Sequence, residues 1–319
     1  MFAEIVSAVA AFIAGVVFGL WWVGEQRRRN ITSRDIYKNI SGVPRAGGLI
    51  AMVAATVGYS LLSTITDKSL LVLVISMIMG ILGLVDDLKG LSEYVRVLVP
   101  VVLAFALART SMITLTVPMV GLFYGATGWL SVLAIPVLTN AFNMLDPVNG
   151  FLPMANTIVG LSLAAVAAIR GQWDAVYLLA VHAAASLSLY VYNRYPAKTF
   201  NGNVGSYFLG ASISTIAVLY DLVPYLILAG LPFVVNGTLI IFSSGGIKGR
   251  EKIERPTYLE NGLVYQQCNS PIISLVRLTV ANGPMNEYGI FKALTALTAA
   301  TSALTVATTA VIHIFSLPI

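Results

Sequence analysis

Apolar runs of about 20 residues recur along this chain, and they constrain its fold more than any other feature. A helix needs roughly 20 consecutive apolar residues to cross the hydrocarbon core of a bilayer. Of 319 residues, 57% are hydrophobic and only 10% are charged, and the mean hydropathy is +0.84. This balance is far from that of soluble domains. We therefore expect an all-α, polytopic membrane protein that forms one integral-membrane domain over residues 1–319.

The runs predict about ten transmembrane helices. They cover residues 2–23, 46–65, 69–85, 96–109, 127–142, 151–169, 174–192, 204–222, 223–242 and 290–312. Almost no connection separates 204–222 from 223–242, so we expect a turn at Asp221, supported by Pro224 close behind it.

Lysine and arginine fall mainly on one side of this predicted membrane. Sixteen of the 19 lie on that side or at its helix ends, and the other side holds Lys68, Arg109 and Arg170. Basic loops stay in the cytoplasm, so both termini are expected outside a cell membrane. Nucleic-acid binding is not expected, because no basic region with interleaved aromatic residues stands apart from the membrane. The single cysteine, Cys268, cannot form an internal disulfide.

The conspicuous polar stretches gather on the same cytoplasmic side. They are KNISGVPRAGG (38–48), VDDLKGLSEYVR (85–96), TNAFNMLDPVNG (139–150), TFNGNVGSYFLG (199–210) and the loop 243–289. Polar residues near a membrane are costly to desolvate and usually have a function. Asp or Asn beside Gly at three helix ends of similar depth therefore indicates one active site on the cytoplasmic face.

Oxygen-bearing side chains dominate these stretches. Adjacent Asp86 and Asp87 would point about 100° apart on a helix, so we expect two different jobs for them. If the helix persists through 139–150, a short spiral of ligands would form from Asn140, Asn143, Asp146 and Asn149. Pro147 and Gly150 instead suggest that the helix opens there and exposes backbone groups. Such donors suit Mg²⁺, with Mn²⁺ as an alternative, bound through one or two carboxylates, water and substrate phosphates.

Four cationic side chains on this side could pair with phosphate, although a solvated or lipid-facing charge explains each equally well: Lys89, Arg96, Lys252 and Arg255. The two histidines, His182 and His313, lie away from this side, where packing or capping roles suffice. A secondary transporter is the rival of a different class, but its site belongs near the bilayer midplane between repeated halves. No repeated halves are evident here.

Four motifs, in this order, resemble those of the polyprenyl-phosphate N-acetylhexosamine-1-phosphate transferases, especially the archaeal members of the dolichyl-phosphate GlcNAc-1-phosphate branch. They are Pro44-Arg45-Ala46-Gly47-Gly48, the Gly-x-x-Asp-Asp-x-x-Gly-Leu run from Gly83 to Leu91, the segment Asn140 to Gly150, and the segment Phe200 to Ser206. The ten-helix layout with both termini outside agrees with this family, and the resemblance also implies a homodimer as a candidate assembly.

The resemblance implies roles for individual residues. Asp86 and Asp87 match the aspartate pair at the reaction centre, and Arg96 matches a basic residue that contacts the pyrophosphate. Metal ligands are implied at Asn143, Asp146 and Asn203. The uracil is held by Asn149 through a hydrogen bond and by Phe200 through stacking. Further substrate contacts are expected from Asn140, Lys38, Arg45, Lys252 and Arg255.

Two departures from the family pattern matter. Asn203 replaces the aspartate of the Phe-x-Gly-Asp motif, whereas the position matching Asp146 is alanine in the eukaryotic branch. Our hypothesis is that the carboxylate of the metal site has moved from position 203 to position 146. Pro147 stands where most relatives have glycine, which affects the shape of that loop.

The loop 243–289 is expected to recognise the sugar. Its stretch 246–267 lacks the histidine cluster of the bacterial muropeptide enzymes, and Arg255-Pro256-Thr257 resembles the archaeal members. A hairpin is expected over 257–267, turning at Glu260-Asn261-Gly262. The resemblance thus implies transfer of GlcNAc-1-phosphate from UDP-GlcNAc to dolichyl or another polyprenyl phosphate. The alternatives are another UDP-N-acetylhexosamine or an undecaprenyl phosphate acceptor.

Overall fold

Helices dominate the computed structural model, which describes residues 2–110, 114–118, 121–123, 132–246 and 253–315. The helices are α1 (Phe2–Arg28), α2 (Gly48–Leu62), α3 (Lys68–Lys89), α4 (Glu93–Thr110), α6 (Ala134–Met144), α7 (Phe151–Ile169), α8 (Trp173–Asn193), α9 (Gly202–Leu219), α10 (Val223–Ala229), α11 (Leu231–Ser244), α12 (Leu275–Thr279) and α13 (Glu287–Ile314). The strands are β1 (Thr32–Asp35), β2 (Ile40–Pro44), β3 (Leu115–Val117), β4 (Gly121–Phe123), β5 (Thr257–Glu260), β6 (Leu263–Gln266) and β7 (Met285–Asn286).

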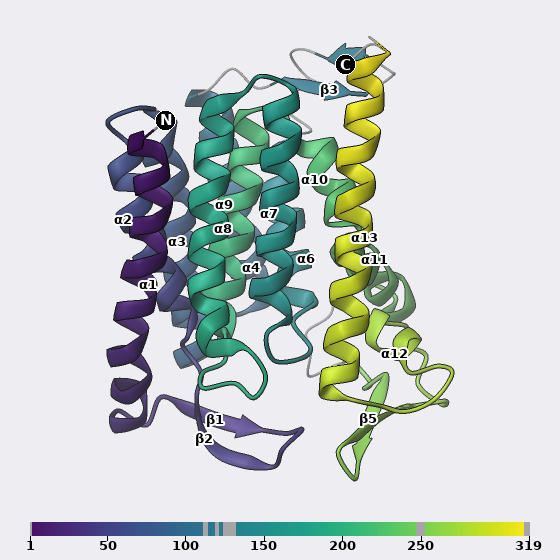
Figure 1. The fold of residues 1–319 in the computed structure, drawn as a ribbon. Coiled ribbons are helices and arrows are strands. Elements are labelled where there is room, and N and C mark those ends of the chain that lie inside the picture. Colours follow the sequence, from purple (N-terminus) through teal and green to yellow (C-terminus); the bar gives the residue numbers. More distant parts are fainter. Residues whose placement is uncertain (1, 111–113, 119–120, 124–131, 247–252, 316–319) are drawn as a thin grey trace.

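Six of the described helices are long and apolar enough to cross a membrane: α1, α3, α7, α8, α9 and α13. They stand as an upright bundle (Figure 1), which confirms a mostly helical, polytopic membrane protein. Three further predicted spans fall on weaker candidates, because α2 has 15 residues, α6 has 11, and α4 carries three charged side chains. Residues 127–131 of the predicted span 127–142 lie outside the described residues.

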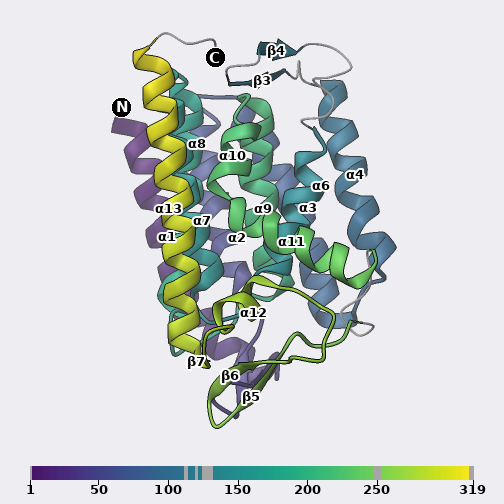
Figure 2. The same cartoon turned by 90° about the vertical axis from the view of Figure 1, so that its right-hand side faces the viewer.

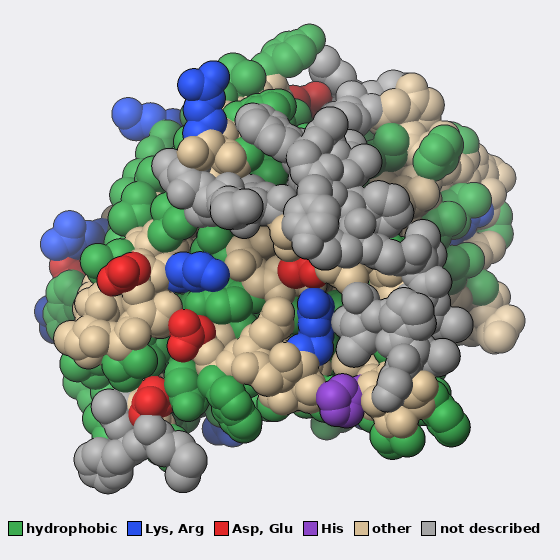
Figure 3. Space-filling model, turned by 90° about the horizontal axis from the view of Figure 1, so that it is seen from above, with side chains coloured by type: hydrophobic (Ala, Val, Ile, Leu, Met, Phe, Trp, Pro, Cys, Tyr) green, Lys and Arg blue, Asp and Glu red, His purple; other side chains and the backbone are tan. Residues whose placement is uncertain are grey.

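The two ends of the bundle differ in character. The start of α1 and the end of α13 lie at one end, and the β1–β2 and β5–β6 hairpins extend from the other (Figures 1 and 2). On the first of these ends, charged side chains of both signs lie among apolar and uncharged ones, and some of them adjoin one another (Figure 3). The polar motifs belong to the hairpin end, so the prediction that they share one depth is consistent with the fold.

The predicted span over 223–242 corresponds to a bent pair of helices. The chain breaks at Gly230 into α10 and α11, which are bent by 78° relative to each other. Pro232 lies in the first turn of α11, where its missing N–H cannot continue the hydrogen bonding of α10. The turn predicted at Asp221 is confirmed, since this residue has a φ of 56° between α9 and α10.

The all-α expectation also needs a correction, because the described residues include three small antiparallel sheets: β1–β2, β3–β4 and β5–β6–β7. They form in segments between the long helices, where backbone groups outside a helix still need partners. The hairpin predicted at Glu260-Asn261-Gly262 is confirmed. Glu260 pairs with Leu263, and Asn261 and Gly262 have φ values of 51° and 76°, as a two-residue hairpin turn requires.

Helix α9 forms the centre of the bundle, and all its residues from Val204 to Leu219 are buried. Glycines let α2 and α3 approach it closely. A Cβ built on Gly83 would overlap the backbone oxygen of Asn203, and one built on Gly48 would overlap the backbone of Gly205. These motif glycines therefore fix the distance between the helices that carry the polar residues.

This packing predicts that Gly83→Ala destabilises the protein by at least about 2 kcal/mol, because the new methyl group has no space against the start of α9. Gly24→Ala in α1 is the matched control, since a Cβ at Gly24 meets no atom within 4 Å and alanine favours a helix. Thermal unfolding of the detergent-solubilised protein compares the two variants. Equal stability would contradict the close packing of α3 on α9.

Candidate active site

Asp86 is a buried carboxylate in the last turn of α3 with three hydrogen-bond donors. Its Oδ1 accepts hydrogen bonds from the Leu91 backbone and from the Arg96 guanidinium, both at 2.8 Å. Its Oδ2 accepts one from Nδ2 of Asn203, also at 2.8 Å. Gly90, with a φ of 70°, ends the helix and turns the chain back toward Asp86. The carboxylate is therefore held in one orientation by α3, α4 and α9.

Asp87 points to different partners and caps α9. Its Oδ1 accepts a hydrogen bond from the backbone N–H of Asn203 at 2.9 Å, and its Oδ2 accepts one from that of Val204 at 3.0 Å. The first N–H groups of a helix have no partner inside it. They also form the positive end of the helix, where phosphate groups bind readily. Asp87 thus lies where an anionic substrate would be attracted.

The start of α9 is pinned against the start of α2. Three backbone hydrogen bonds, each 2.8 Å long, pair segment 44–48 with segment 200–201. Gly202 has a φ of 68°, and a Cβ there would overlap both the Arg45 carbonyl and the Asp87 carboxylate. The Pro-Arg-x-Gly-Gly and Phe-x-Gly motifs therefore meet as neighbouring backbones, which places Arg45 close enough to Asp87 to interact electrostatically.

Helix α6 ends at Met144, so the condition for a spiral of ligands over 140–149 is not met, and the chain opens before Pro147 and Gly150 as those residues suggested. Leu145 takes a φ of −118° and a ψ of 71°. Pro147 disfavours helical backbone at the residue before it, Asp146. Asn140 stays inside the helix and donates its Nδ2 to the Pro136 carbonyl at 2.8 Å.

The end of α6 nevertheless reaches the first turns of α9. Oδ1 of Asn143 accepts a hydrogen bond from the Ser206 hydroxyl at 2.6 Å. Oδ2 of Asp146 accepts one from Nδ2 of Asn201 at 2.9 Å, and Oδ1 of Asn201 is buried without a partner among the described residues. Residues 201–206 thus contact the polar side chains of both α3 and α6.

A cavity of about 300 Å³ lies beside Asp146. This volume is at the lower limit of small-molecule sites, which span about 300–1,000 Å³. Its lining includes Asp35, Tyr37, Asp146, Asn149, Phe200 and Asn201. Two residues predicted to hold uracil therefore line the same cavity, next to a residue predicted to bind metal.

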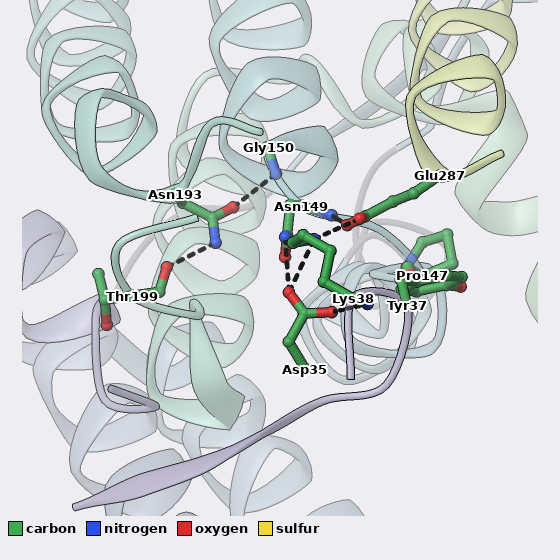
Figure 4. Close-up of polar contacts among 9 residues, drawn as sticks. All are labelled: Asp35, Tyr37, Lys38, Pro147, Asn149, Gly150, Asn193, Thr199 and Glu287. Atoms are coloured by element: carbon green, nitrogen blue, oxygen red, sulfur yellow. Dashed lines mark hydrogen bonds and ion pairs between the residues drawn. The ribbon is translucent and has the colours of Figure 1, made fainter. Parts of the chain in front are cut away.

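A charged cluster surrounds Asn149 (Figure 4). The Asn149 backbone N–H donates to Glu287 at 3.0 Å, and Nδ2 of Asn149 donates to Asp35 at 3.3 Å. Lys38 forms ion pairs with both carboxylates, 2.7 Å from Asp35. Burial alone would lower the pKa of the Lys38 ammonium, but its hydrogen bonds and charge interactions with Asp35 and Glu287 raise it above the ordinary value. Lys38 is therefore charged at neutral pH.

Sequence reasoning missed Asp35 and Glu287. Both side chains are almost fully buried, at 2% and 4% exposed. Asp35 precedes the β1–β2 turn and Glu287 begins α13, so the two are far apart in the sequence and belong to no shared motif. The only available signal was the rarity of acidic residues, 14 in the whole chain.

The arginine and lysine residues predicted to contact substrate do not all lie near the aspartate pair. Arg96 contacts Asp86 and Arg45 lies near Asp87, so the structure brings both to the aspartate pair. Lys89 and Arg255 are exposed. Lys252 lies outside the described residues.

The loop after α11 is tied to the end of α6. Asn236 of α11 donates its Nδ2 to the Met144 carbonyl at 3.2 Å, and its Oδ1 accepts from the Leu275 backbone at 3.0 Å. Arg277 donates to three carbonyl oxygens of the loop before α12, and Cys268 in that loop is exposed. The predicted sugar-recognition loop therefore packs next to the residues that follow α6.

The oxygen atoms that could bind a metal ion at the hairpin end of the bundle belong to both carboxylate and amide groups. Among the residues that the structure describes, no three His, Cys, Asp or Glu side chains form a metal cluster. The available donors are the Asp146 carboxylate and amide oxygens, including the unpaired Oδ1 of Asn201. Asn203 gives its Nδ2 to Asp86, which leaves only its Oδ1 able to bind a cation. One carboxylate with several neutral oxygens fits Mg²⁺ better than zinc.

Comparisons with known proteins agree with the resemblance seen in the sequence. The family described as "Glycosyl transferase family 4" matches residues 69–221. A Sulfolobus acidocaldarius protein named "Putative UDP-N-acetylglucosamine--dolichyl-phosphate N-acetylglucosaminephosphotransferase" is 27% identical over 304 residues, covering 90% of each chain. A Saccharolobus solfataricus protein of the same name is 29% identical over 248 residues, 73% of this chain and 76% of the relative.

A bacterial relative extends the similarity. The phospho-N-acetylmuramoyl-pentapeptide-transferase of Geobacillus kaustophilus is 30% identical over 229 residues, 65% of this chain and 70% of its own length. The matched region includes the aspartate pair of α3, the end of α6 and the start of α9. On this similarity and on the site built from those three helix ends, the chain belongs to glycosyl transferase family 4.

Proposed function

We propose that the protein transfers GlcNAc-1-phosphate from UDP-GlcNAc to dolichyl phosphate and releases UMP. One observation carries this proposal: Asp86, Asp87 and the end of α6 converge on the first turns of α9, beside the cavity that Phe200 and Asn149 line. The names of the two Sulfolobus and Saccharolobus relatives support this donor and acceptor.

In this reaction an oxygen of the lipid phosphate attacks the β-phosphorus of UDP-GlcNAc, and the bond from that phosphorus to the UMP oxygen breaks. A phosphate monoester has a second pKa of about 6, so most of the acceptor is already a dianion at neutral pH. A strong base is therefore unnecessary. Catalysis of phosphoryl transfer depends mainly on positioning and on neutralising charge.

The residues of the site divide between these tasks. Arg96 and Arg45 offer positive charge where two anionic groups must meet. Asp86 and Asp87 belong to the reaction centre, where one of them would orient the lipid phosphate or accept its residual proton and the other would bind the metal ion or water. The uracil ring stacks on Phe200 and hydrogen-bonds to Asn149 in the cavity.

Mg²⁺, with Mn²⁺ as its substitute, would be held by Asp146, Asn143 and Asn203. When bound, it neutralises charge on the donor diphosphate and makes UMP a better leaving group. The moved carboxylate at position 146 is supported by the hydrogen bond from Asn203 to Asp86, because an ionised carboxylate at position 203 could not donate it.

The membrane arrangement completes the proposal. Ten spans follow from the apolar runs, and the distribution of lysine and arginine favours an orientation with the site on the cytoplasmic face and both termini outside. A soluble nucleotide sugar then meets a phosphate held at headgroup depth by its lipid tail. The loop 243–289, with its β5–β6 hairpin and Arg255, would choose the sugar.

UMP release by the purified protein tests this function. We expect release only when UDP-GlcNAc, Mg²⁺ and a polyprenyl phosphate are all present, with dolichyl phosphate preferred over undecaprenyl phosphate. Parallel reactions with UDP-GalNAc test the sugar. Uptake of UDP-GlcNAc into proteoliposomes without UMP release would instead identify a transporter and reject the proposal.

A further inference from the structure

The side-chain amide of Asn149 is oriented by a carboxylate. Its Nδ2 donates to Oδ2 of Asp35 (Figure 4), and Asp35 is also ion-paired with Lys38. An ionised carboxylate accepts hydrogen bonds and cannot donate them. The amide must therefore turn its nitrogen toward Asp35. Its oxygen, which accepts no hydrogen bond within the described part of the chain, remains available as an acceptor in the residue that lines the cavity.

Asp35 is itself fixed in place. Its side chain is 2% exposed, and Lys38 joins it to Glu287, the first residue of α13. Glu287 also accepts the backbone N–H of Asn149. Both the backbone and the side chain of Asn149 are thus held by buried carboxylates that share one ammonium. Because the side-chain amide of Asn149 is already held in one orientation, binding a ligand does not have to pay the entropy of orienting it.

We propose that Asp35 is a positioning residue that makes the site select uracil over cytosine. This inference rests on the proposed function, in which Asn149 contacts the base of UDP-GlcNAc. The N3 atom of uracil carries a hydrogen and donates, whereas N3 of cytosine carries a lone pair and accepts. An amide oxygen fixed at Asn149 satisfies uracil, and it would place two acceptors opposite each other for cytosine.

Competition by UMP and CMP, measured as inhibition of transfer and as direct binding, tests the inference. The wild-type protein should bind UMP at least about tenfold more tightly than CMP. In Asp35→Asn, the new side chain can offer either oxygen or nitrogen, so the Asn149 amide is free to turn. The UMP preference should then fall about tenfold, toward equal binding.

A double variant that exchanges the side chains at positions 35 and 149 is expected to restore the preference for UMP. In Asp35→Asn/Asn149→Asp, the new carboxylate at position 149 accepts in any orientation, and the new amide at position 35 donates to it. The UMP preference should recover. Because the pair is complementary again, the swap also tests the inference where the single variant does not fold. A folded swap variant that binds UMP no better than CMP overturns the inference.

Glu287→Gln is the matched control. Glu287 contacts the backbone N–H of Asn149 and the ammonium of Lys38, but not the side-chain amide of Asn149. It should weaken UMP and CMP by the same factor. If Asp35→Asn also weakens both equally, Asp35 has only a structural role and the inference fails. A wild-type protein that binds neither nucleotide would instead reject the proposed function, so the two failures are distinguishable.

Discussion

Asp87→Asn is expected to lower kcat for UMP release by roughly a hundred- to a thousandfold while the protein still folds and inserts. The substitution removes a negative charge beside the positive end of α9. It also replaces one of two acceptors by an NH₂ group that faces a backbone N–H. The lost cap should cost only about 1 kcal/mol, so activity falls far more than stability. Kinetics and thermal unfolding of the same preparation measure both effects.

Asp67→Asn is the control for this prediction. Asp67 is an exposed carboxylate at the opposite end of α3, and its side chain makes no capping hydrogen bond. Loss of the same charge there should leave kcat unchanged. Rates near wild type in Asp87→Asn would remove the charge of Asp87 from the mechanism.

Asp146→Ala is expected to raise the Mg²⁺ concentration needed for half-maximal rate by at least about tenfold and to lower kcat, because the site loses the carboxylate assigned to the cation. Adding Asn203→Asp should restore part of the Mg²⁺ affinity, since it returns a carboxylate to the neighbouring position. By itself, Asn203→Asp sets a second carboxylate against Asp86 and should lower the Tm of the metal-free protein. Mg²⁺ should recover that loss by binding the folded state.

UMP release against Mg²⁺ concentration and the shift of Tm with Mg²⁺ provide two independent measurements. Asp174→Ala, which removes an exposed carboxylate at the other end of the bundle, serves as the control. Full activity and unchanged Mg²⁺ dependence in both Asp146→Ala and Asn203→Ala would place the cation elsewhere.

The helical core was predictable because a helix that spans a bilayer requires a long, continuous apolar segment, which is recognisable in the sequence. The break at Gly230 was missed because the span was assigned from hydropathy, which carries no information about bending, although Gly230 and Pro232 are helix-breaking residues. The opening of the chain before Pro147 could be expected from that residue, but the earlier end of α6 at Met144 could not.

The candidate site was predictable as far as its motifs extend. Asp86, Asp87 and Asn203 meet because glycines such as Gly83 allow α3 to approach α9 closely. The cluster around Asn149 was not predictable. Asp35 and Glu287 come from opposite ends of the chain, and only the folded bundle brings them to one lysine. Contacts between single residues so far apart in the sequence produce no periodic pattern from which they could be predicted.

The exposed Cys268 has a practical consequence. It is the one cysteine of the sequence and lies on the loop assigned to sugar choice. A maleimide dye would therefore attach at a single known position without any mutation. Changes in its fluorescence on adding a nucleotide sugar would follow that loop in real time, separately from the chemical step.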